Sequence, residues 1–362
     1  MAAVQPLARI PVGNSEPIRV MIVDDSLVAR TALARMLGED EGFVIVGEAG
    51  SAKAALEKLA RVDTDIILLD LEMPGQNGLA ALPDLIEAGR GARVLVLSAA
   101  CAEGADVCVS ALRLGAADTL LKPHAGRLAG QFTAELRERL RRVAATEAIL
   151  ASPSVPRPVS AAPRTARPVA CIGIGSSTGG VHALGAFFAS LPPSCRAPIL
   201  ITQHLPEQFM MPFVGQLAEM AGRPTRLAAN GMPLVPGEMI LAPGHAHLTV
   251  TRVRETVHIK LDRRPAPSGC RPSVDPMFES LAEVFGPKAL GIVLSGMGRD
   301  GLIGAHAIAE AQGAILAQDA ATSVVWGMPG VVANAKLATA VLPPNEIARC
   351  VGAWTAEETQ WK

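Results

Sequence analysis

Six consecutive residues near the middle of the chain have the types that nucleophilic catalysis needs. Residues 175–180 read Gly-Ser-Ser-Thr-Gly-Gly and lie between a short apolar run and a stretch with the pattern of a helix. A serine at the centre of G-x-S-x-G, where a strand turns into a helix, is exposed to a substrate, and the helix N-terminus favours an oxyanion beside it. The motif predicts Ser177 as a nucleophile, with Ser176 as a rival that is off the centre of the turn.

A serine hydroxyl needs a base that accepts its proton and a carboxylate that orients the base. His204 follows the aliphatic run 199–202, and Asp300 follows the aliphatic run 290–294. Both are expected at the same sheet edge as Ser177. The order Ser, His, Asp differs from the Ser, Asp, His order of α/β-hydrolases, so such a triad would be convergent. The backbone of Met297, between two glycines, is a candidate donor to an oxyanion.

Each of these residues also has an ordinary alternative. Gly173-Ile174-Gly175 begins like a dinucleotide-binding loop, but Thr178 occupies the place of the third glycine, and Gln203-His204 stands where an acidic ribose ligand is expected. A lone histidine is often structural, and an aspartate before a helix is often an N-cap. The combination of the three residues favours the triad.

A second set of chemically active residues lies at strand ends in the first third of the chain. Asp24 and Asp25 end one aliphatic run, Asp70 ends another, and Ser98 and Lys122 follow two more. The carboxyl ends of parallel strands meet in one crevice. Clustered carboxylates there suit Mg²⁺, Lys122 offers a charge to a phosphoryl oxygen, and Asp70 is the natural acceptor of a phosphoryl group. Capping alone is the alternative for Asp25 and Asp70.

The elements that must position these residues alternate between strand and helix, which indicates parallel sheets with right-handed crossovers. We expect an α/β protein with an extension over 1–17 that is disordered, a flavodoxin-like doubly wound domain over 18–142, a Pro/Ala/Arg-rich linker over 143–168 and a second doubly wound α/β domain over 169–357. Residues 239–261 have period-two β-branched positions, which favours an antiparallel insertion or hairpin.

Composition excludes several classes of protein. Lys and Arg number 33 against 34 Asp and Glu, which makes nucleic acid an improbable partner. The six cysteines form no C-x-x-C pair, so neither a disulfide framework nor a zinc site is expected. No stretch approaches the roughly 18 apolar residues of a membrane span, and we expect a soluble cytoplasmic protein without membrane insertion.

The first domain resembles the response-regulator receiver domain. The likeness rests on IVDDS, LLDLEMPGQNG, VLVLS and LLKP, within residues 18–140. It implies Mg²⁺ held by Asp25, Asp70 and the backbone carbonyl of Glu72, beside Asp24. It also implies that a histidine kinase phosphorylates Asp70 and so moves the face that carries Ser98 and Lys122. Thr119 stands where many receivers have an aromatic residue, so an aromatic rotamer switch is not assumed.

The second domain resembles the catalytic domain of the chemotaxis protein-glutamate methylesterases. The likeness is carried by Ser177-Thr178-Gly179-Gly180, Gln203-His204, RPSVDPMF at 271–278, SGMGRDG at 295–301 and Trp326-Gly327-Met328-Pro329. It implies hydrolysis of glutamate γ-methyl esters on chemoreceptor helices, and glutamine deamidation in many members, without a cofactor in this domain. Ser177 would be the nucleophile, His204 the base, Asp300 the orienting acid, and Thr178 and Met297 would lie near the oxyanion.

Two positions depart from that family, since Ser176 stands for a common alanine and Arg299 for a frequent asparagine. Neither change removes a triad member, but Ser176 bears on substrate positioning. Our leading hypothesis is an esterase whose unphosphorylated receiver packs over the cleft of Ser177. An adaptor with an unproductive triad, and a hydrolase of another ester, are the alternatives.

Overall fold

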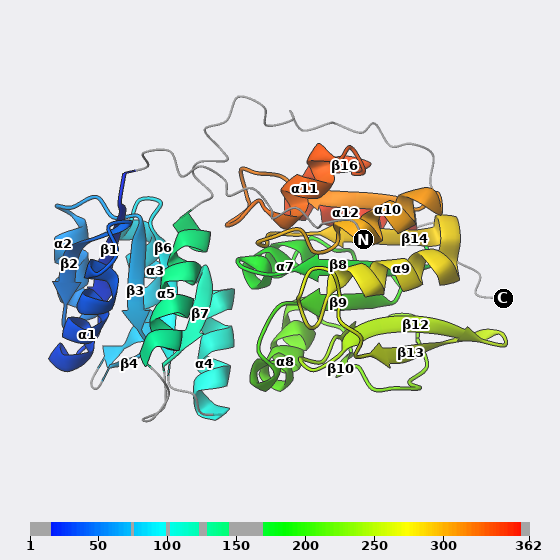
Figure 1. Ribbon diagram of the computed structural model, residues 1–362. Helices are drawn as coiled ribbons and strands as arrows, with labels where there is room; N and C mark the ends of the chain where they lie inside the picture. The colour runs from blue at the N-terminus through cyan, green and yellow to red at the C-terminus, as the bar shows by residue number, and fades with distance from the viewer. Residues whose placement is uncertain (1–15, 74–75, 99–101, 123–128, 145–168, 356–362) are drawn as a thin grey trace, which may run out of the picture.

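The computed structural model describes residues 16–73, 76–98, 102–122, 129–144 and 169–355. Almost all of the expected N-terminal extension and of the expected linker lies outside these ranges. The described chain forms two α/β domains that lie side by side (Figure 1). None of the described helices is both long enough and apolar enough to cross a bilayer.

The N-terminal domain is built on a five-stranded sheet in the order β2-β1-β3-β6-β7. All neighbouring strands are parallel, and their bounds are β1 Ile18–Val23, β2 Phe43–Ala49, β3 Ile66–Asp70, β6 Arg93–Ser98 and β7 Asp118–Leu121. A short antiparallel pair, β4 Glu72–Met73 and β5 Gln76–Asn77, follows β3. The strands are apolar on both faces because helices cover both sides of a parallel sheet.

Among the described residues, five helices cover the two faces of this sheet. Their bounds are α1 Leu27–Gly38, α2 Ala52–Leu59, α3 Gly78–Ala88, α4 Ala102–Arg113 and α5 Ala129–Ala144. Leu37 of α1 and Leu136 of α5 pack on Ile22, whereas Leu59 of α2 and Leu82 of α3 belong to the core on the opposite face. Alternate residues of each strand therefore enter alternate cores, as the period of a strand requires.

The C-terminal domain is built on a seven-stranded parallel sheet in the order β10-β11-β9-β8-β14-β15-β16. The strands are β8 Cys171–Ser176, β9 Ile199–Gln203, β10 Thr225–Leu227, β11 Met239–Leu241, β14 Ala289–Val293, β15 Ala314–Gln318 and β16 Ala340–Leu342. The chain leaves β8 toward β9 and later returns to β14 on the other side of β8. Ligands of such sheets bind where the strand order reverses, outside the carboxyl ends of the strands.

Helices and a hairpin enclose this second sheet. The helices are α7 Gly180–Phe188, η1 Glu207–Phe209, α8 Met210–Ala221, α9 Val274–Phe285, η2 Gly286–Lys288, α10 Leu302–Glu310, α11 Met328–Asn334 and α12 Pro344–Thr355. Strands β12 His247–Val253 and β13 Thr256–Asp262 form the antiparallel hairpin. The expected antiparallel segment was too long, because Met239–Leu241 lies between β9 and β10 as a parallel strand of the main sheet.

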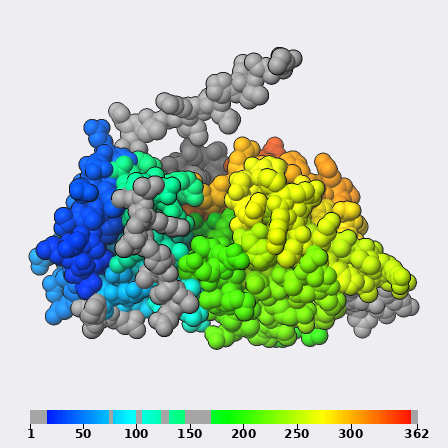
Figure 2. All heavy atoms as spheres, turned by 60° about the horizontal axis from the view of Figure 1, so that its bottom comes forward, coloured from blue at the N-terminus to red at the C-terminus, as the bar shows by residue number. Residues whose placement is uncertain are grey.

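The two domains touch through the edge of the first sheet. Helix α4 packs against α7, α8 and η1 of the second domain, and in Figure 2 the cyan atoms of the first domain abut the green atoms of the second. The backbone N–H of Gly179 donates a hydrogen bond of 2.9 Å to the carbonyl of Ala117, just before β7. The contact therefore reaches the turn that carries Ser177.

Candidate active site and phosphorylation site

The turn between β8 and α7 exposes one of its two serines and buries the other. Ser176, the last residue of β8, is fully buried, and its hydroxyl donates a 2.6 Å hydrogen bond to Oε1 of Gln203. Ser177 is partly exposed and lines a cavity of about 590 Å³. Gly179 has φ 75°, and a Cβ there would lie 2.4 Å from Cβ of Val324, so the sharp turn requires glycine.

His204 follows β9, and its side chain faces the same cavity as Ser177. Nε2 of His204 lies 2.7 Å from Oδ2 of Asp300, which comes after β14. The structure thus brings together the three sequence-predicted residues at the carboxyl ends of three adjacent strands. This is the arrangement in which a base is oriented by a buried carboxylate.

Asp300 is held by donors that the sequence analysis did not single out. Ser273 donates its hydroxyl to Oδ1 at 2.6 Å, and the backbone N–H of Val274 donates to Oδ2 at 2.7 Å. The N–H groups of Gly301 and Asp275 also donate to Oδ1. A carboxylate that accepts several hydrogen bonds is stabilised in its charged form and has a fixed orientation.

The ionisation states at this site follow from burial and from these contacts. Burial lowers the pKa of His204, but its hydrogen bonds with Asp300 and Cys270 outweigh burial and raise the pKa to about 9. Burial raises the pKa of Asp300, but His204 and Ser273 outweigh it and lower the pKa to about 2. Burial, with Asp300 nearby, raises the pKa of Asp275 to about 7. Asp300 is therefore the ionised partner of the pair, and its carboxylate stabilises the imidazolium that forms when His204 accepts a proton.

The two residues predicted to lie near the oxyanion line the same cavity. Thr178 and Met297 both line it, and within the described ranges neither backbone N–H has a hydrogen-bond acceptor. The N–H of Ser177 itself is occupied, since it donates to the carbonyl of Ser295 at 3.0 Å. The amides of Thr178 and Met297 are consequently available to an oxyanion formed beside Ser177.

The N-terminal domain roofs the cavity. Asp118, Thr119, Glu138, Arg139 and Arg142 supply that side of the lining. The hydroxyl of Thr178 lies 3.3 Å from Oδ2 of Asp118, whose other oxygen is 3.2 Å from Nη1 of Arg139. The receiver therefore forms one wall of the cavity that contains Ser177.

The sequence-predicted phosphorylation residues also converge. Asp24, Asp25 and Asp70 offer carboxylate oxygens that lie within 4.8 Å of one another. Nζ of Lys122 is 2.7 Å from Asp70 and 3.1 Å from Asp24. Burial raises the pKa of Asp70, although Lys122 opposes that shift. Three clustered oxygen donors are the ligand chemistry that a hard divalent cation prefers, so the residues present fit such an ion.

Ser98 and Glu72 complete the rim of this acidic pocket. Ser98 donates its hydroxyl to Oε1 of Glu72 at 3.2 Å, and its carbonyl accepts from the backbone N–H of Lys122. The N–H of Glu72 donates to Oδ1 of Asp70. The switch pair Ser98 and Lys122 therefore lies next to the proposed acceptor.

Comparisons with known proteins identify both domains. Residues 172–351 match the family described as CheB methylesterase, and residues 20–130 match the response regulator receiver domain. Over 338 residues the chain is 46% identical to protein-glutamate methylesterase/protein-glutamine glutaminase 2 of Caulobacter vibrioides, covering 91% of this chain and 96% of the relative. The chain belongs to the CheB methylesterase family.

One further relative is similar over nearly the whole chain, and one solved structure over its second half. The protein-glutamate methylesterase/protein-glutamine glutaminase of group 2 operon of Bradyrhizobium diazoefficiens is 38% identical, with 91% of this chain and 92% of that protein covered. The crystal structure of the Thermotoga maritima CheB methylesterase catalytic domain is 32% identical, with 51% of this chain and 98% of that chain covered and a TM-score of 0.49. The expected fold class and the expected enzyme class are both confirmed by the family.

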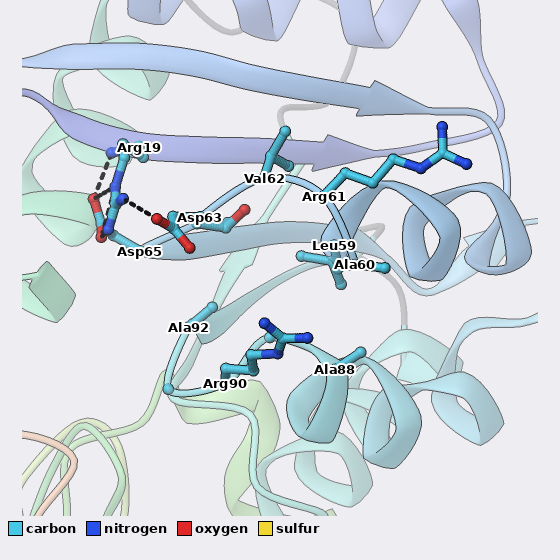
Figure 3. A pocket seen from close by; sticks show the side chains of 13 residues that line it. Arg19, Leu59, Ala60, Arg61, Val62, Asp63, Asp65, Ala88, Arg90 and Ala92 are labelled. Carbon is cyan, nitrogen blue, oxygen red and sulfur yellow. Dashed lines mark hydrogen bonds and ion pairs between the residues drawn. The ribbon is translucent and has the colours of Figure 1, made fainter.

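A further pocket lies away from both sites of this family member. It has a volume of about 260 Å³ and lies at the amino ends of the receiver strands, opposite to the end that carries Asp70 (Figure 3). Arg19 is paired there with Asp65 at 2.7 Å and with Asp63 at 3.4 Å. Arg61 and Arg90 line the same pocket.

Proposed function

We propose that this chain hydrolyses glutamate γ-methyl esters on the helices of bacterial chemoreceptors, and that phosphorylation of Asp70 controls the reaction. The observation that carries the proposal is one cavity that joins Ser177 to the His204–Asp300 pair and is roofed by the receiver. The relatives' names support both the ester substrate and deamidation of glutamine at the same positions.

In the proposed reaction the Ser177 hydroxyl attacks the ester carbonyl while His204 accepts its proton. Asp300 stabilises the imidazolium, and the amides of Thr178 and Met297 stabilise the oxyanion. His204 then gives the proton to the leaving methoxide, methanol departs, and a water activated by His204 hydrolyses the acyl-enzyme. With glutamine the leaving group is ammonia, and the same acyl-enzyme forms.

The proposed control begins at the receiver. A cytoplasmic histidine kinase of the chemotaxis array donates the phosphoryl group to Asp70. Asp24, Asp25, Asp70 and the carbonyl of Glu72 would hold Mg²⁺, which would supply positive charge beside the phosphoryl oxygens. Lys122 exchanges its contact with the Asp70 carboxylate for the phosphoryl group, and Ser98 donates its hydroxyl to it. Asp118 and Thr119, which line the cavity of Ser177, begin the strand β7 that Lys122 directly follows, so a change at Lys122 reaches the interface.

Methanol release from a methyl-esterified receptor fragment tests the proposal, with and without a small phosphodonor and Mg²⁺. We expect stimulation in the wild type, loss of activity in Ser177→Ala and an unstimulated basal rate in Asp70→Ala. Ser176→Ala is the matched variant, because it removes the neighbouring hydroxyl, which is buried against Gln203. Full activity in Ser177→Ala together with loss in Ser176→Ala would transfer the nucleophile to Ser176, and no release from wild type would refute this substrate.

A further inference from the structure

A thiol lies beside the catalytic histidine. The causes of the raised His204 pKa include a hydrogen bond with Cys270. The imidazole nitrogen of His204, the thiol sulfur of Cys270 and a carboxylate oxygen of Asp300 all lie within 4.8 Å of one another. These residues come from three separate segments: the end of β9, the loop between β13 and α9, and the turn after β14. The three residues are too far apart in the sequence for their spacing to predict the cluster.

The three ligand types form a set that favours one class of metal. Nitrogen, sulfur and oxygen donors in a tetrahedral arrangement suit Zn²⁺, whereas a thiolate is a poor ligand for Mg²⁺. The oxygen-only cluster of Asp24, Asp25 and Asp70 has the opposite preference. The ligands of the cluster in the second domain therefore favour a metal such as Zn²⁺, whereas those in the first domain favour a hard cation such as Mg²⁺.

The cluster is accessible and already oriented. Cys270 is partly exposed and lines both the 590 Å³ cavity and a neighbouring cavity of about 400 Å³. Asp300 is fixed by Ser273, and the same serine's backbone N–H is bound by Nδ1 of His247. Ligands that are fixed by such outer contacts bind metal more tightly than mobile ones. The larger cavity leaves room for a water as the fourth ligand, which is the open position of a three-ligand zinc site.

We propose that His204, Cys270 and Asp300 form an inhibitory site for Zn²⁺. A neutral imidazole bound to a metal through one nitrogen carries its proton on the other, so it has no lone pair left to accept the proton of Ser177. Binding releases the thiol proton and the second proton of His204 to solvent and takes away the catalytic base. Metal binding itself is independent of the proposed function, and only its inhibitory consequence rests on it.

Cobalt(II) is the probe for binding, because it takes the place of zinc and its bond to a thiolate gives a charge-transfer band in the near ultraviolet. The full-length chain is titrated with cobalt(II) in an excess of Mg²⁺, which occupies the carboxylate cluster, and with a non-thiol reductant, which keeps the cysteines reduced. Zn²⁺ is then added, and its affinity is measured by competition with a chromophoric chelator. We expect a thiolate band that Zn²⁺ abolishes. Cys270→Ser should lose the band and bind Zn²⁺ about 100-fold or more weakly.

Cys350→Ser is the matched control, since Cys350 is also partly exposed but lies on α12. It should keep both the band and the zinc affinity. Absence of the band in the wild type, or its persistence in Cys270→Ser, would overturn the site. In the activity arm, Zn²⁺ should inhibit methanol release by the wild type, reversibly with a chelator, and leave Cys270→Ser uninhibited at the same concentration. Equal inhibition of wild type and Cys270→Ser would also refute the assignment of the site. If neither protein hydrolyses the ester, the cobalt band and its loss in Cys270→Ser decide whether the metal site exists.

Discussion

Removing the carboxylate of Asp118 should loosen the receiver from the catalytic domain. Asp118 accepts a hydrogen bond from the Thr178 hydroxyl across the interface, at 3.3 Å, and its side chain is 19% exposed. A hydrogen bond to a charged group contributes about 1.5–3 kcal/mol when it is short and buried. Because this one is long and partly solvated, we assign it about 1 kcal/mol.

That free energy sets the size of the expected effect. If basal turnover is proportional to the fraction of molecules whose roof is open, a change of about 1 kcal/mol raises it about fivefold. The phosphodonor-stimulated rate should not change, since the catalytic residues are untouched. Methanol release by Asp118→Ala, measured with and without phosphodonor, gives both rates in one experiment.

Two variants control for indirect effects. Asp118 also pairs with Arg139, so the loss of Asp118 perturbs the receiver itself. Glu135→Ala removes another carboxylate partner of Arg139, at 3.0 Å, and Glu135 does not line the cavity between the domains. It should leave the basal rate unchanged. Asp118→Asn keeps an oxygen acceptor for Thr178 and should give an intermediate rate. An unchanged basal rate in Asp118→Ala, or an equal rise of the stimulated rate, would refute the argument.

Three further variants probe the scaffold. Ser273→Ala removes a 2.6 Å hydrogen bond to Asp300 and should lower kcat about tenfold at unchanged KM, because a hydrogen bond to a charged group contributes about 1.5–3 kcal/mol. Steady-state kinetics would measure this loss, with circular dichroism to check that the variant folds. An unchanged kcat would contradict the prediction. Gly179→Ala should destabilise the catalytic domain by about 1–3 kcal/mol, since its Cβ would meet Val324; thermal unfolding measures this against Gly185→Ala, where a Cβ meets nothing closer than 3.6 Å. Arg19→Met should cost about 1 kcal/mol at pH 7, because Arg19 outweighs burial and lowers the pKa of Asp65. A carboxylate whose pKa is lowered in the folded state stabilises the fold at pH values above its unfolded pKa, and this stabilisation is lost as pH falls through the folded pKa. The difference in the free energy of unfolding in urea between Arg19→Met and wild type should therefore shrink toward pH 3. A difference that stays constant with pH would exclude this cause.

Much of the fold was predictable from the sequence, because aliphatic runs that end in polar residues are strong signals for parallel strands. Ser177 was predicted from the G-x-S-x-G motif at the end of such a run, and His204 and Asp300 from their positions directly after two others. The antiparallel assignment of Met239–Leu241 was wrong, because period-two alternation indicates a strand but not the direction of its neighbours.

The remainder of the site could not be predicted in the same way. Cys270 and Ser273 lie between β13 and α9, in a segment without periodicity, and they reach His204 and Asp300 only through the tertiary fold. The contact of Asp118 with Thr178 joins two domains that are separated by the linker in sequence, and no local pattern encodes it. Local sequence patterns therefore predicted the strands and helices, whereas the contacts that orient the site residues depend on how these elements pack.

The hydrogen bond from Gly179 to Ala117 joins the two domains through main-chain atoms alone. A side-chain substitution does not remove this hydrogen bond. A mutation can therefore weaken this part of the domain interface only by displacing the backbone of Gly179 or Ala117. The donor is also one residue away from Thr178, which makes the Gly179 amide proton a natural reporter of closure. Its exchange with deuterated solvent should be slow when the receiver covers the turn and fast when it departs, so one amide would record the open fraction without any label.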